Sequence, residues 1–550
     1  GFGRTAVFTW VMGKDSDLGG MYVVANTVPN IIFEIVAGGA LASLVVPLLA
    51  GAVTAGDRAA VAATTGALLT WTVSLLAPLA VAAAVFAEPI VALVADSRPA
   101  ADIAAGARML RIFAPQLPLY GIGIVLTGVL QSYRRFAWPV LAPLLSSVTV
   151  IGVYLAFAAI EGLHPSIAGV GRGGELVLSG GTTLGVVVLS LSLLIPIRQL
   201  RLRPRFGYAF PPAARSRIVG LAAAGAVTVT AQQLALLVTL NRVAGGPTGA
   251  PVVYNLAQTI YLLPWAVLAV PLAVAAYPAL AAAHATGDTA EYRRTLAPTA
   301  RGVLLFSCLG AAALVATAEP VAAFFWTDPG RQPAAAIAGF APGLLGYGLF
   351  AILTRALYAR DAARPAAWAT VAGWLVVALA AVWLAAVIPA DYRVFAVALA
   401  NSVGMLVMGG LLVGAVAREA GRPALAGFAR AGLVGLLAGA VAAVAGAVLA
   451  HHLSELVDGT PTRGAALLQG MLSGVVAGAV FLAVAYPLDR HDVRPMLAAV
   501  RRRLPGGGST GDAPAGSGPT GRGGADHAGG DGAGGGDASG GGDGKEQVSR

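Results

Sequence analysis

The chain has 550 residues, of which 57% are hydrophobic and only 11% are charged, and its mean hydropathy is +0.77. Soluble domains carry roughly 25% charged residues, so this composition excludes a soluble globular protein. The net charge of +10 does not indicate nucleic-acid binding, because the arginines are spread over short gaps between apolar stretches and form no single patch.

Fourteen apolar stretches fill the chain as far as about residue 487. A helix of about 20 apolar residues crosses a hydrocarbon core about 30 Å thick, and it satisfies its backbone hydrogen bonds without water. The sequence therefore predicts an all-α polytopic membrane protein with 14 transmembrane helices. The predicted spans are residues 1–13, 21–50, 60–86, 109–131, 137–160, 177–197, 218–241, 252–281, 302–325, 335–358, 365–388, 392–417, 426–450 and 464–487.

The first span ends near Gly13, about a third short of a crossing, so we expect helix 1 to be truncated at its start. The gaps after even-numbered spans, with the segment after span 14, hold between two and three times as many lysines and arginines as the gaps after odd-numbered spans. Positively charged loops stay on the cytoplasmic side. Both termini are therefore predicted to be cytoplasmic, and an odd number of spans would destroy this bias.

The two halves of the chain share short motifs. Residues 23–26 open span 2 with Val-Val-Ala-Asn, and residues 252–255 open span 8 with Val-Val-Tyr-Asn. The separation of about 230 residues corresponds to six spans, and an even number predicts parallel repeats related by a pseudo-two-fold axis along the membrane normal. Chance recurrence in a low-complexity chain is the alternative.

This repeat predicts two six-helix lobes and two additional C-terminal helices. The predicted domains are an N-terminal lobe at 1–200, a cytoplasmic basic linker at 201–217, a C-terminal lobe at 218–417, a segment at 418–504 with spans 13 and 14 and a basic juxtamembrane stretch, and a tail at 505–550. The tail is rich in Gly, Ser, Asp and Pro with almost no apolar side chains. We therefore expect it to be disordered and cytoplasmic.

Polar side chains inside the spans mark candidate functional positions, because a polar group in hydrocarbon is costly. Glu34 lies within an apolar run, and Arg4 on the neighbouring first helix is its expected counter-ion. The pair is either a gate or coupling site that titrates as a cavity opens, or a static internal ion pair.

A second polar group lies in spans 7 and 8. Asn255, Gln258 and Thr259 follow i, i+3, i+4 spacing and therefore share one helix face. With Gln232 and Gln233 of span 7, they are expected to form a cavity wall. For any single residue, hydrogen bonding between helices is the alternative.

Motifs for enzyme chemistry are absent from the sequence. It contains no phosphate-binding loop, no serine-hydrolase elbow, no zinc-protease motif and no cysteine pair, and its single Cys308 lies within an apolar span. We therefore expect a transporter that is not an enzyme and that holds no cofactor or metal.

Several segments carry a resemblance to a known family. They are GFGR at 1–4, VANTVPN at 24–30, GGAL at 38–41 with Val46-Pro47, MLRI at 109–112, LQSYRRFAWP at 130–139, LLPWAVLAV at 262–270 and RALYARD at 355–361. In order and spacing the chain resembles the MurJ (MviN) lipid II flippases of the MOP exporter superfamily, and most of all their actinobacterial branch.

The resemblance implies fourteen helices in two six-helix lobes plus a final pair. It implies alternating-access export of a lipid-linked peptidoglycan precursor, lipid II, from the inner to the outer leaflet of the bacterial plasma membrane. Cell-wall synthesis proteins are implied as further partners. A sodium ion or a proton as coupling ion, and the membrane potential, are left open as the driving force.

The resemblance also implies roles for particular residues. Arg4 matches a cavity arginine that the family uses near the pyrophosphate, and Arg111 or Arg355 is expected to help it hold the head group. The expected substrate-binding and transport residues are Arg4, Asn26, Asn30, Glu34, Arg111, Gln232, Gln233, Asn255, Gln258, Thr259 and Arg355.

The chain departs from the family at several of these positions. Phe33 and Glu34 stand where many bacterial members have two arginines, Gln258 and Thr259 replace an Asp-Arg pair, and Gly20 replaces an acidic residue. Fewer cations in the cavity would suit a divergent paralogue. The alternatives are a cation-coupled exporter of drugs or metabolites, a flippase for another lipid-linked glycan, and a non-transporting scaffold for cell-wall assembly.

Overall fold

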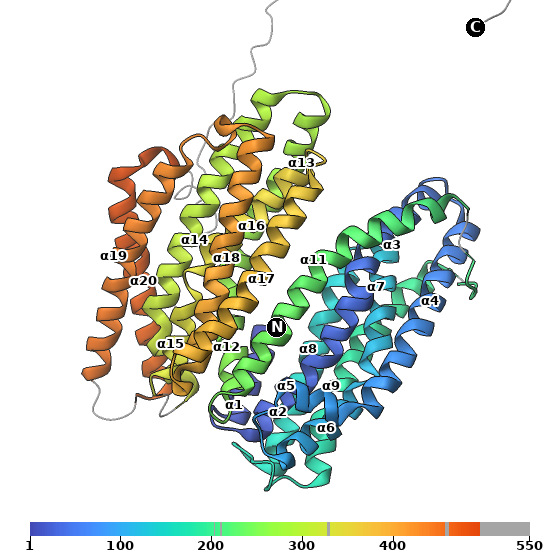
Figure 1. Cartoon of the computed structure of the whole chain (residues 1–550), viewed down its shortest axis with the longest axis horizontal. Helices are drawn as coiled ribbons and strands as arrows, with labels where there is room; N and C mark the ends of the chain where they lie inside the picture. Colours follow the sequence, from blue (N-terminus) through green and yellow to red (C-terminus); the bar gives the residue numbers. More distant parts are fainter. Residues whose placement is uncertain (203, 210–211, 327–329, 457–460, 495–550) are drawn as a thin grey trace, which may run out of the picture. The chain divides into compact units, whose positions relative to one another are not determined.

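The computed structural model describes residues 1–494 except 203, 210–211, 327–329 and 457–460. The predicted tail at 505–550 and the end of the juxtamembrane stretch lie outside the described residues. Within the described part every regular element is a helix, as the sequence predicts (Figure 1).

The first half of the chain forms ten helices and one short π-helical turn. Their bounds are α1 Phe2–Met12, α2 Asp17–Phe33, η1 Glu34–Gly38, α3 Gly39–Thr54, α4 Arg58–Val85, α5 Ala87–Val94, α6 Ala100–Phe113, α7 Gln116–Ser132, α8 Ala137–Glu161, α9 Arg172–Ser192 and α10 Leu194–Gln199.

The second half begins with the long helix α11, which starts at Pro212, inside the segment expected to be a linker. The elements are α11 Pro212–Ala244, α12 Ala250–Pro264, η2 Trp265–Ala269, α13 Val270–Ala285, α14 Thr289–Phe325, α15 Gln332–Phe340, α16 Gly343–Tyr358, α17 Ala363–Val387, η3 Ala390–Tyr392, α18 Arg393–Glu419, η4 Arg422–Leu425, α19 Phe428–Glu455 and α20 Arg463–Leu488.

The helices have the length and surface of membrane-spanning segments. Among the described residues, 12 helical segments are long and apolar enough to cross a bilayer. The other two predicted spans fall on α1, which has 11 residues, and on α11. Large apolar side chains such as Val140, Leu379 and Leu433 are more than two-thirds exposed on the outer faces of α8, α17 and α19, where lipid would cover them. The all-helical membrane fold is confirmed, and the count of fourteen crossings stays a prediction.

Each half packs around its own apolar interior. In the first half α8 packs on α9, α2 on α6 and α4 on α7, and in the second half α17 and α16 pack on α18. The C-terminal helices α19 and α20 pack on each other and on α14. Helix α11 contacts both halves, since it packs on α3 and on α17.

The two halves repeat the same helix irregularities. The π-helical turn η1 follows α2, and η2 follows α12 about 230 residues later. A helix also breaks at Ala114-Pro115, between α6 and α7, and again at Ala341-Pro342, between α15 and α16. Proline cannot donate a backbone hydrogen bond and disturbs the preceding turn, so equivalent prolines produce equivalent breaks. These matched breaks are structural support for the internal repeat.

A hydroxyl group from a neighbouring helix bonds to each of the two Ala-Pro breaks, and the one in the second half is fully buried. In the first half Thr183 on α9 donates to the carbonyl of Ile112 at 2.9 Å and accepts from the side chain of Gln116 at 3.1 Å. In the second half Ser402 on α18 donates to the carbonyl of Gly339 at 2.7 Å and accepts from the backbone N–H of Gly343 at 3.0 Å. Thr183 thus satisfies one backbone carbonyl at the first break, and Ser402 satisfies a carbonyl and an N–H at the second.

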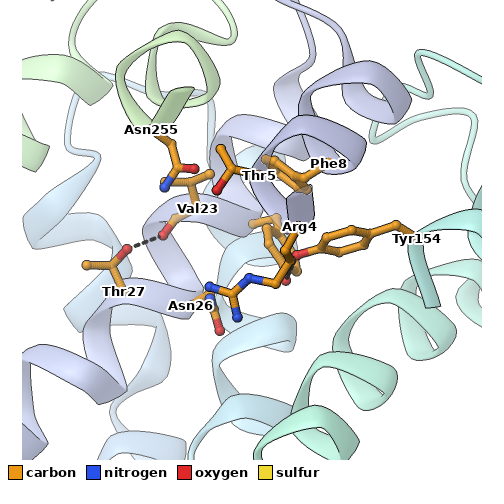
Figure 2. A pocket seen from close by; sticks show the side chains of 9 residues that line it. Arg4, Thr5, Phe8, Val23, Asn26, Thr27, Tyr154 and Asn255 are labelled. Atoms are coloured by element: carbon orange, nitrogen blue, oxygen red, sulfur yellow. Dashed lines mark hydrogen bonds between the residues drawn. The ribbon is translucent and has the colours of Figure 1, made fainter. Parts of the chain in front are cut away.

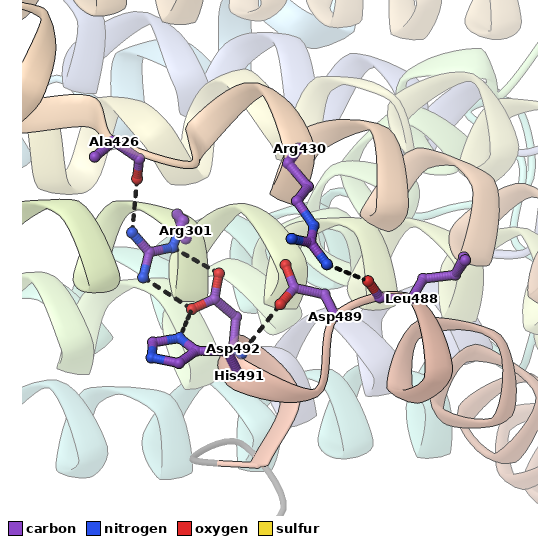
Figure 3. A network of polar contacts seen from close by, with 7 residues as sticks. All are labelled: Arg301, Ala426, Arg430, Leu488, Asp489, His491 and Asp492. Atoms are coloured by element: carbon purple, nitrogen blue, oxygen red, sulfur yellow. Dashed lines mark hydrogen bonds and ion pairs between the residues drawn. The ribbon is translucent and has the colours of Figure 1, made fainter.

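An ionic network joins the segment after α20 to the bundle (Figure 3). Arg301 on α14 donates to both carboxylate oxygens of Asp492, at 2.6 and 2.9 Å, and to the carbonyl of Ala426 at 2.6 Å. Arg430 on α19 donates to the carbonyl of Leu488 at 2.8 Å. The Arg301 and Asp492 side chains are only 12% and 10% exposed, so this pair is much better shielded from water than an ordinary surface pair.

Ser402→Ala should lower the free energy of unfolding by about 1 kcal/mol, because it leaves the Gly339 carbonyl and the Gly343 N–H without a partner inside the bundle. Thermal unfolding in detergent measures this. Ser147→Ala is the matched control, since its exposed hydroxyl bonds only to the carbonyl of Pro143 one turn earlier. Equal melting temperatures for both variants would show that the hydrogen bonds of Ser402 do not stabilise the fold.

Asp492→Asn should destabilise the protein by about 2 kcal/mol at pH 7, the typical contribution of hydrogen bonds to a charged group. Burial raises the pKa of the Asp492 carboxyl, but hydrogen bonds from Arg301 and His491 outweigh it and hold this pKa below its usual range. A lowered native pKa stabilises the fold above the unfolded pKa, and this stabilisation is lost as the pH falls below about 4.

The stability difference between wild type and Asp492→Asn should therefore shrink in unfolding curves recorded at decreasing pH. Glu291→Gln is the control, since it breaks the exposed Arg294–Glu291 pair and should change stability by a few tenths of a kcal/mol. A difference that stays constant between pH 7 and pH 3 would contradict the role given to the carboxylate.

Candidate functional site

The two halves approach each other closely at the N-terminal ends of α2 and α12. Gly249 has a φ of +77°, and an added Cβ atom there would collide with the Lys14 carbonyl. A Cβ at Gly19 would lie 2.9 Å from the Val252 side chain, and one at Gly20 would lie 3.6 Å from that of Pro251. Gly19 and Gly249 thus allow the two helix ends to meet, whereas a Cβ at Gly20 would make only ordinary contact.

Polar contacts strengthen this junction. The guanidinium of Arg98 donates to the carbonyls of Ala244, Gly246 and Pro247, at 2.9, 3.1 and 2.9 Å. Asn241 on α11 donates to the carbonyls of Leu93 and Val94 at 3.2 and 3.3 Å. The described structure is therefore closed at this end by contacts between the loop after α5 and the loop between α11 and α12, and we call this set of contacts the Arg98 junction.

A cavity of about 390 Å³ lies behind the junction, between the two halves. Helices α1, α2, α7, α8, α9, α11 and α12 contribute to its wall. Its lining residues are Arg4, Val23, Asn26, Thr27, Asn30, Tyr120, Ser146, Val150, Thr182, Val186, Leu189, Leu236, Leu240, Tyr254, Asn255 and Gln258. We call this space the central cavity.

Arg4 is the only charged residue among the described residues that line the central cavity. It also lines a smaller pocket of about 50 Å³ with Asn26, Tyr154 and Asn255, and Figure 2 shows its guanidinium beside Asn26. Within the described part of the chain no acidic side chain pairs with Arg4. An uncompensated cation within the membrane attracts anions, because burying it without a partner is costly.

Hydroxyl groups from three helices meet next to Arg4. Tyr22 on α2 shares hydrogen bonds of 2.8 Å with Tyr154 on α8 and with Thr182 on α9, and Thr182 donates to the carbonyl of Leu178. The rings of Tyr22 and Tyr154 are almost fully buried and pack against Phe8. This hydrogen-bond network holds uncharged polar groups in fixed positions next to Arg4.

A second, apolar cavity of about 470 Å³ lies between α1, α12, α14 and α20. Phe2 near the start of α1 lines it, together with Ile260 and Leu263 of α12. On the other sides it is lined by Leu314, Phe325 and Met471. Its surface is almost entirely hydrocarbon, so it suits an acyl or isoprenoid chain. We call it the apolar groove.

The structure brings five of the expected site residues together in the central cavity. They are Arg4, Asn26, Asn30, Asn255 and Gln258. Asn255 and Gln258 lie on the face of α12 that the helical spacing predicts. Thr259 on the same face instead packs toward α1, where its hydroxyl donates to the Asn255 carbonyl at 2.7 Å and lies 3.4 Å from the Thr5 hydroxyl.

The expected ion pair between Arg4 and Glu34 is absent from the described residues. Glu34 begins the π-helical turn η1, eight residues beyond Asn26, which is roughly 12 Å along the helix. Its carboxylate folds against Gly38, where an added Cβ would collide with it. Arg4 lies at the level of Tyr22 and Asn26, so the two charges occupy different depths although their helices are neighbours in sequence.

Four other expected residues do not line the central cavity. Arg111 on α6 is exposed, and Arg355 on α16 donates to the Ala351 carbonyl of its own helix at 2.6 Å. On α11 the cavity wall is formed by Leu236 and Leu240, and not by Gln232 or Gln233. Gln233 is 7% exposed, and its side-chain oxygen has no hydrogen-bond partner in the described structure.

Sequence reasoning missed the tyrosines and threonines of the cavity. Tyr22, Tyr120, Tyr154 and Thr182 carry no charge and lie in ordinary apolar spans, so their composition gives no signal. The sequence does carry a signal for Tyr254, because this residue lies four positions before Gln258 and therefore on the same helix face. In the structure the Gln258 amide donates to the Tyr254 hydroxyl at 3.1 Å.

Comparisons with known proteins agree with this geometry. The family model of the lipid II flippase MurJ matches residues 11–460. The lipid II flippase MurJ of Burkholderia cenocepacia is 25% identical over 349 residues, which cover 62% of this chain and 66% of that protein, slightly less than two thirds of its length.

Solved structures also match over most of their length. A lipid II flippase MurJ in an inward closed conformation has a TM-score of 0.67 at 18% identity, over 89% of this chain and 96% of that one. A multidrug-resistance MATE transporter of the MOP superfamily, in an inward-facing conformation, has a TM-score of 0.60 at 14% identity, over 80% of this chain and 94% of the other. At these identities the two structures show a shared fold.

Arg98→Ala should loosen the Arg98 junction and expose the central cavity at that end. A cysteine at Val23, which lines the cavity, reports this in a Cys308→Ser background when an impermeant maleimide is added to one side of oriented vesicles. With Arg98 intact we expect little labelling from the side of the junction. Arg98→Ala should raise it several-fold, because three hydrogen bonds between the halves are lost.

Arg172→Ala is the matched control, since Arg172 is an exposed arginine of the first half at the start of α9. Labelling that rises equally in both variants, or in neither, would show that Arg98 does not hold the junction closed.

Proposed function

We propose, because the chain belongs to the MurJ lipid II flippase family, that it moves a lipid-linked peptidoglycan precursor from the cytoplasmic to the outer leaflet by alternating access. The observation that carries the proposal is the central cavity, in which an arginine without an acidic partner is surrounded by uncharged polar groups between two repeated halves. Such a cavity suits an anionic head group that must not meet hydrocarbon.

In this proposal the head group of the substrate lies in the central cavity and its lipid tail lies in the apolar groove. Arg4 holds the diphosphate in the central cavity, and Asn26, Asn30, Asn255 and Gln258 form its polar wall. The lipid tail lies in the apolar groove, which begins at Phe2, only two residues before Arg4. Phe2 and Arg4 are about 200° apart around α1, so the covalent link between head and tail passes around the start of this helix.

The transport state follows from the predicted orientation. With both termini cytoplasmic, the Arg98 junction lies at the outer face and the described structure is closed toward the outside. In the proposed cycle the head group enters from the cytoplasm, the junction opens, and the head group leaves into the outer leaflet. The matched breaks at Pro115 and Pro342 and the π-helical turns are the positions where the helices bend.

The membrane potential is the proposed driving force. An inside-negative potential favours outward movement of negative charge by about 2.3 kcal/mol per charge at 100 mV. Glu34 is the proposed site for a coupling ion, if one takes part, since its carboxylate lies in a membrane helix with no cation paired to it in the described residues. No covalent chemistry is part of this cycle.

Arg4→Ala should abolish flipping, because the cavity loses the only charged group among its described lining residues. The test is whether full-length protein in liposomes exposes labelled lipid II on the opposite leaflet, and whether each variant supports growth of a strain depleted of its own flippase. We expect at least a hundredfold loss of flipping, and Arg4→Lys should retain part of it since the charge stays but the bidentate geometry is lost.

Arg111→Ala is the matched control, because Arg111 is exposed and lies outside the cavity wall. It should flip lipid II at close to the wild-type rate. Wild-type flipping by Arg4→Ala would remove Arg4 from the mechanism. Absence of flipping by the wild-type chain, with intact folding, would favour the exporter or the non-transporting scaffold over a flippase.

A further inference from the structure

Two asparagines occupy equivalent positions in the two halves and face the same cavity. Asn26 is the fourth residue of the motif at 23–26 on α2, and Asn255 is the fourth residue of the matching motif at 252–255 on α12. Both line the small pocket beside Arg4 and the central cavity (Figure 2). The internal repeat thus places one carboxamide on each side of the same space, one from each half.

These carboxamides have unused hydrogen-bonding capacity. The side-chain oxygen of Asn26 is buried and has no partner in the described structure. The side chain of Asn255 likewise makes no hydrogen bond among the described residues, although its backbone carbonyl accepts from Thr259. A buried acceptor that lacks a partner costs about 1–3 kcal/mol, so the Asn26 oxygen favours a ligand that donates a hydrogen bond to it.

The chemistry of the missing partner differs from that of a phosphate. A carboxamide offers one accepting oxygen and two donating N–H groups, whereas a deprotonated phosphate offers only acceptors. Phosphate oxygens can satisfy Arg4 and the amide N–H groups, but they leave both amide oxygens unpaired. Hydroxyl groups and the acetamido N–H of a sugar donate hydrogen bonds and also accept them.

We propose that Asn26 and Asn255 together bind the sugar next to the diphosphate, so that this protein selects a glycosylated lipid diphosphate over the same lipid without its sugar. The inference rests on the proposed function and adds the feature of the substrate that is recognised. Arg4 supplies the attraction for charge, which both lipids share. The asparagine pair supplies the discrimination, and because each half contributes one member, the sugar also links the halves across the cavity.

The test compares two lipids on full-length protein in nanodiscs. One is lipid II and the other is the polyprenyl diphosphate that lacks the sugars, and equilibrium binding is measured for each. Wild type should prefer lipid II at least tenfold. Asn26→Leu and Asn255→Leu, which keep a side chain branched at Cγ but remove the amide, should each weaken lipid II binding about tenfold and change binding of the bare diphosphate less than twofold.

Controls separate recognition from folding. Gln131→Leu alters an exposed amide at the end of α7 and should change neither affinity. Asn26→Ser keeps a group that both donates and accepts, so it should retain part of the preference, and it replaces Asn26→Leu if that variant unfolds. Arg4→Ala should weaken both lipids equally.

Each outcome has one meaning. Equal weakening of both lipids by the asparagine variants, or an unchanged preference, overturns the role given to the pair. Failure of the wild type to bind either lipid contradicts the proposed function itself.

Discussion

The central constraint on this molecule is a single guanidinium held within the membrane without an acidic partner among the described residues. An ion at that depth is tolerated only if water, polar groups or an anion surrounds it. The helices around Arg4 supply tyrosine and threonine hydroxyls and carboxamides, with apolar side chains behind them. Among the described residues a polar space thus lies where the two halves meet, and the proposed transport depends on it.

The internal repeat explains how such a space can change its access. Both halves carry a π-helical turn and an Ala-Pro break, and in both a hydroxyl group from a neighbouring helix bonds to the break. The halves are not identical, because an aromatic column that includes Tyr261, Tyr347 and Trp265 lies beside the π-helical turn of the second. The π-helical turn of the first half begins with Glu34 and that of the second with Trp265, so the first half is the more polar at this turn.

Hydropathy and helical periodicity predict much of this arrangement from the sequence. Mean hydropathy over about twenty residues locates the spans, and i, i+3 spacing places Asn255 and Gln258 on one face. The depth of a side chain in the membrane and the rotation of a helix about its axis do not follow from hydropathy and spacing alone. Arg4 and Glu34 lie on consecutive spans, yet their separation along the axis keeps them apart. Leu236 and Leu240 of α11 line the cavity in place of the neighbouring glutamines, because packing against two halves fixes the rotation of that helix.

The presence of one cation among the described lining residues sets the electrostatics of a loaded cavity. A diphosphate diester carries two negative charges, and one arginine neutralises only one of them. A cavity with several arginines would hold the same head group in a neutral or positive complex, on which an inside-negative potential exerts no outward pull. In the proposed cycle Arg4 is the only charged group among the described lining residues, so a bound diphosphate leaves about one net negative charge, and an inside-negative field favours the outward-open loaded state by about 2.3 kcal/mol at 100 mV. Weaker electrostatic retention also eases release, and it shifts the task of recognition from charge to the uncharged amides of the wall.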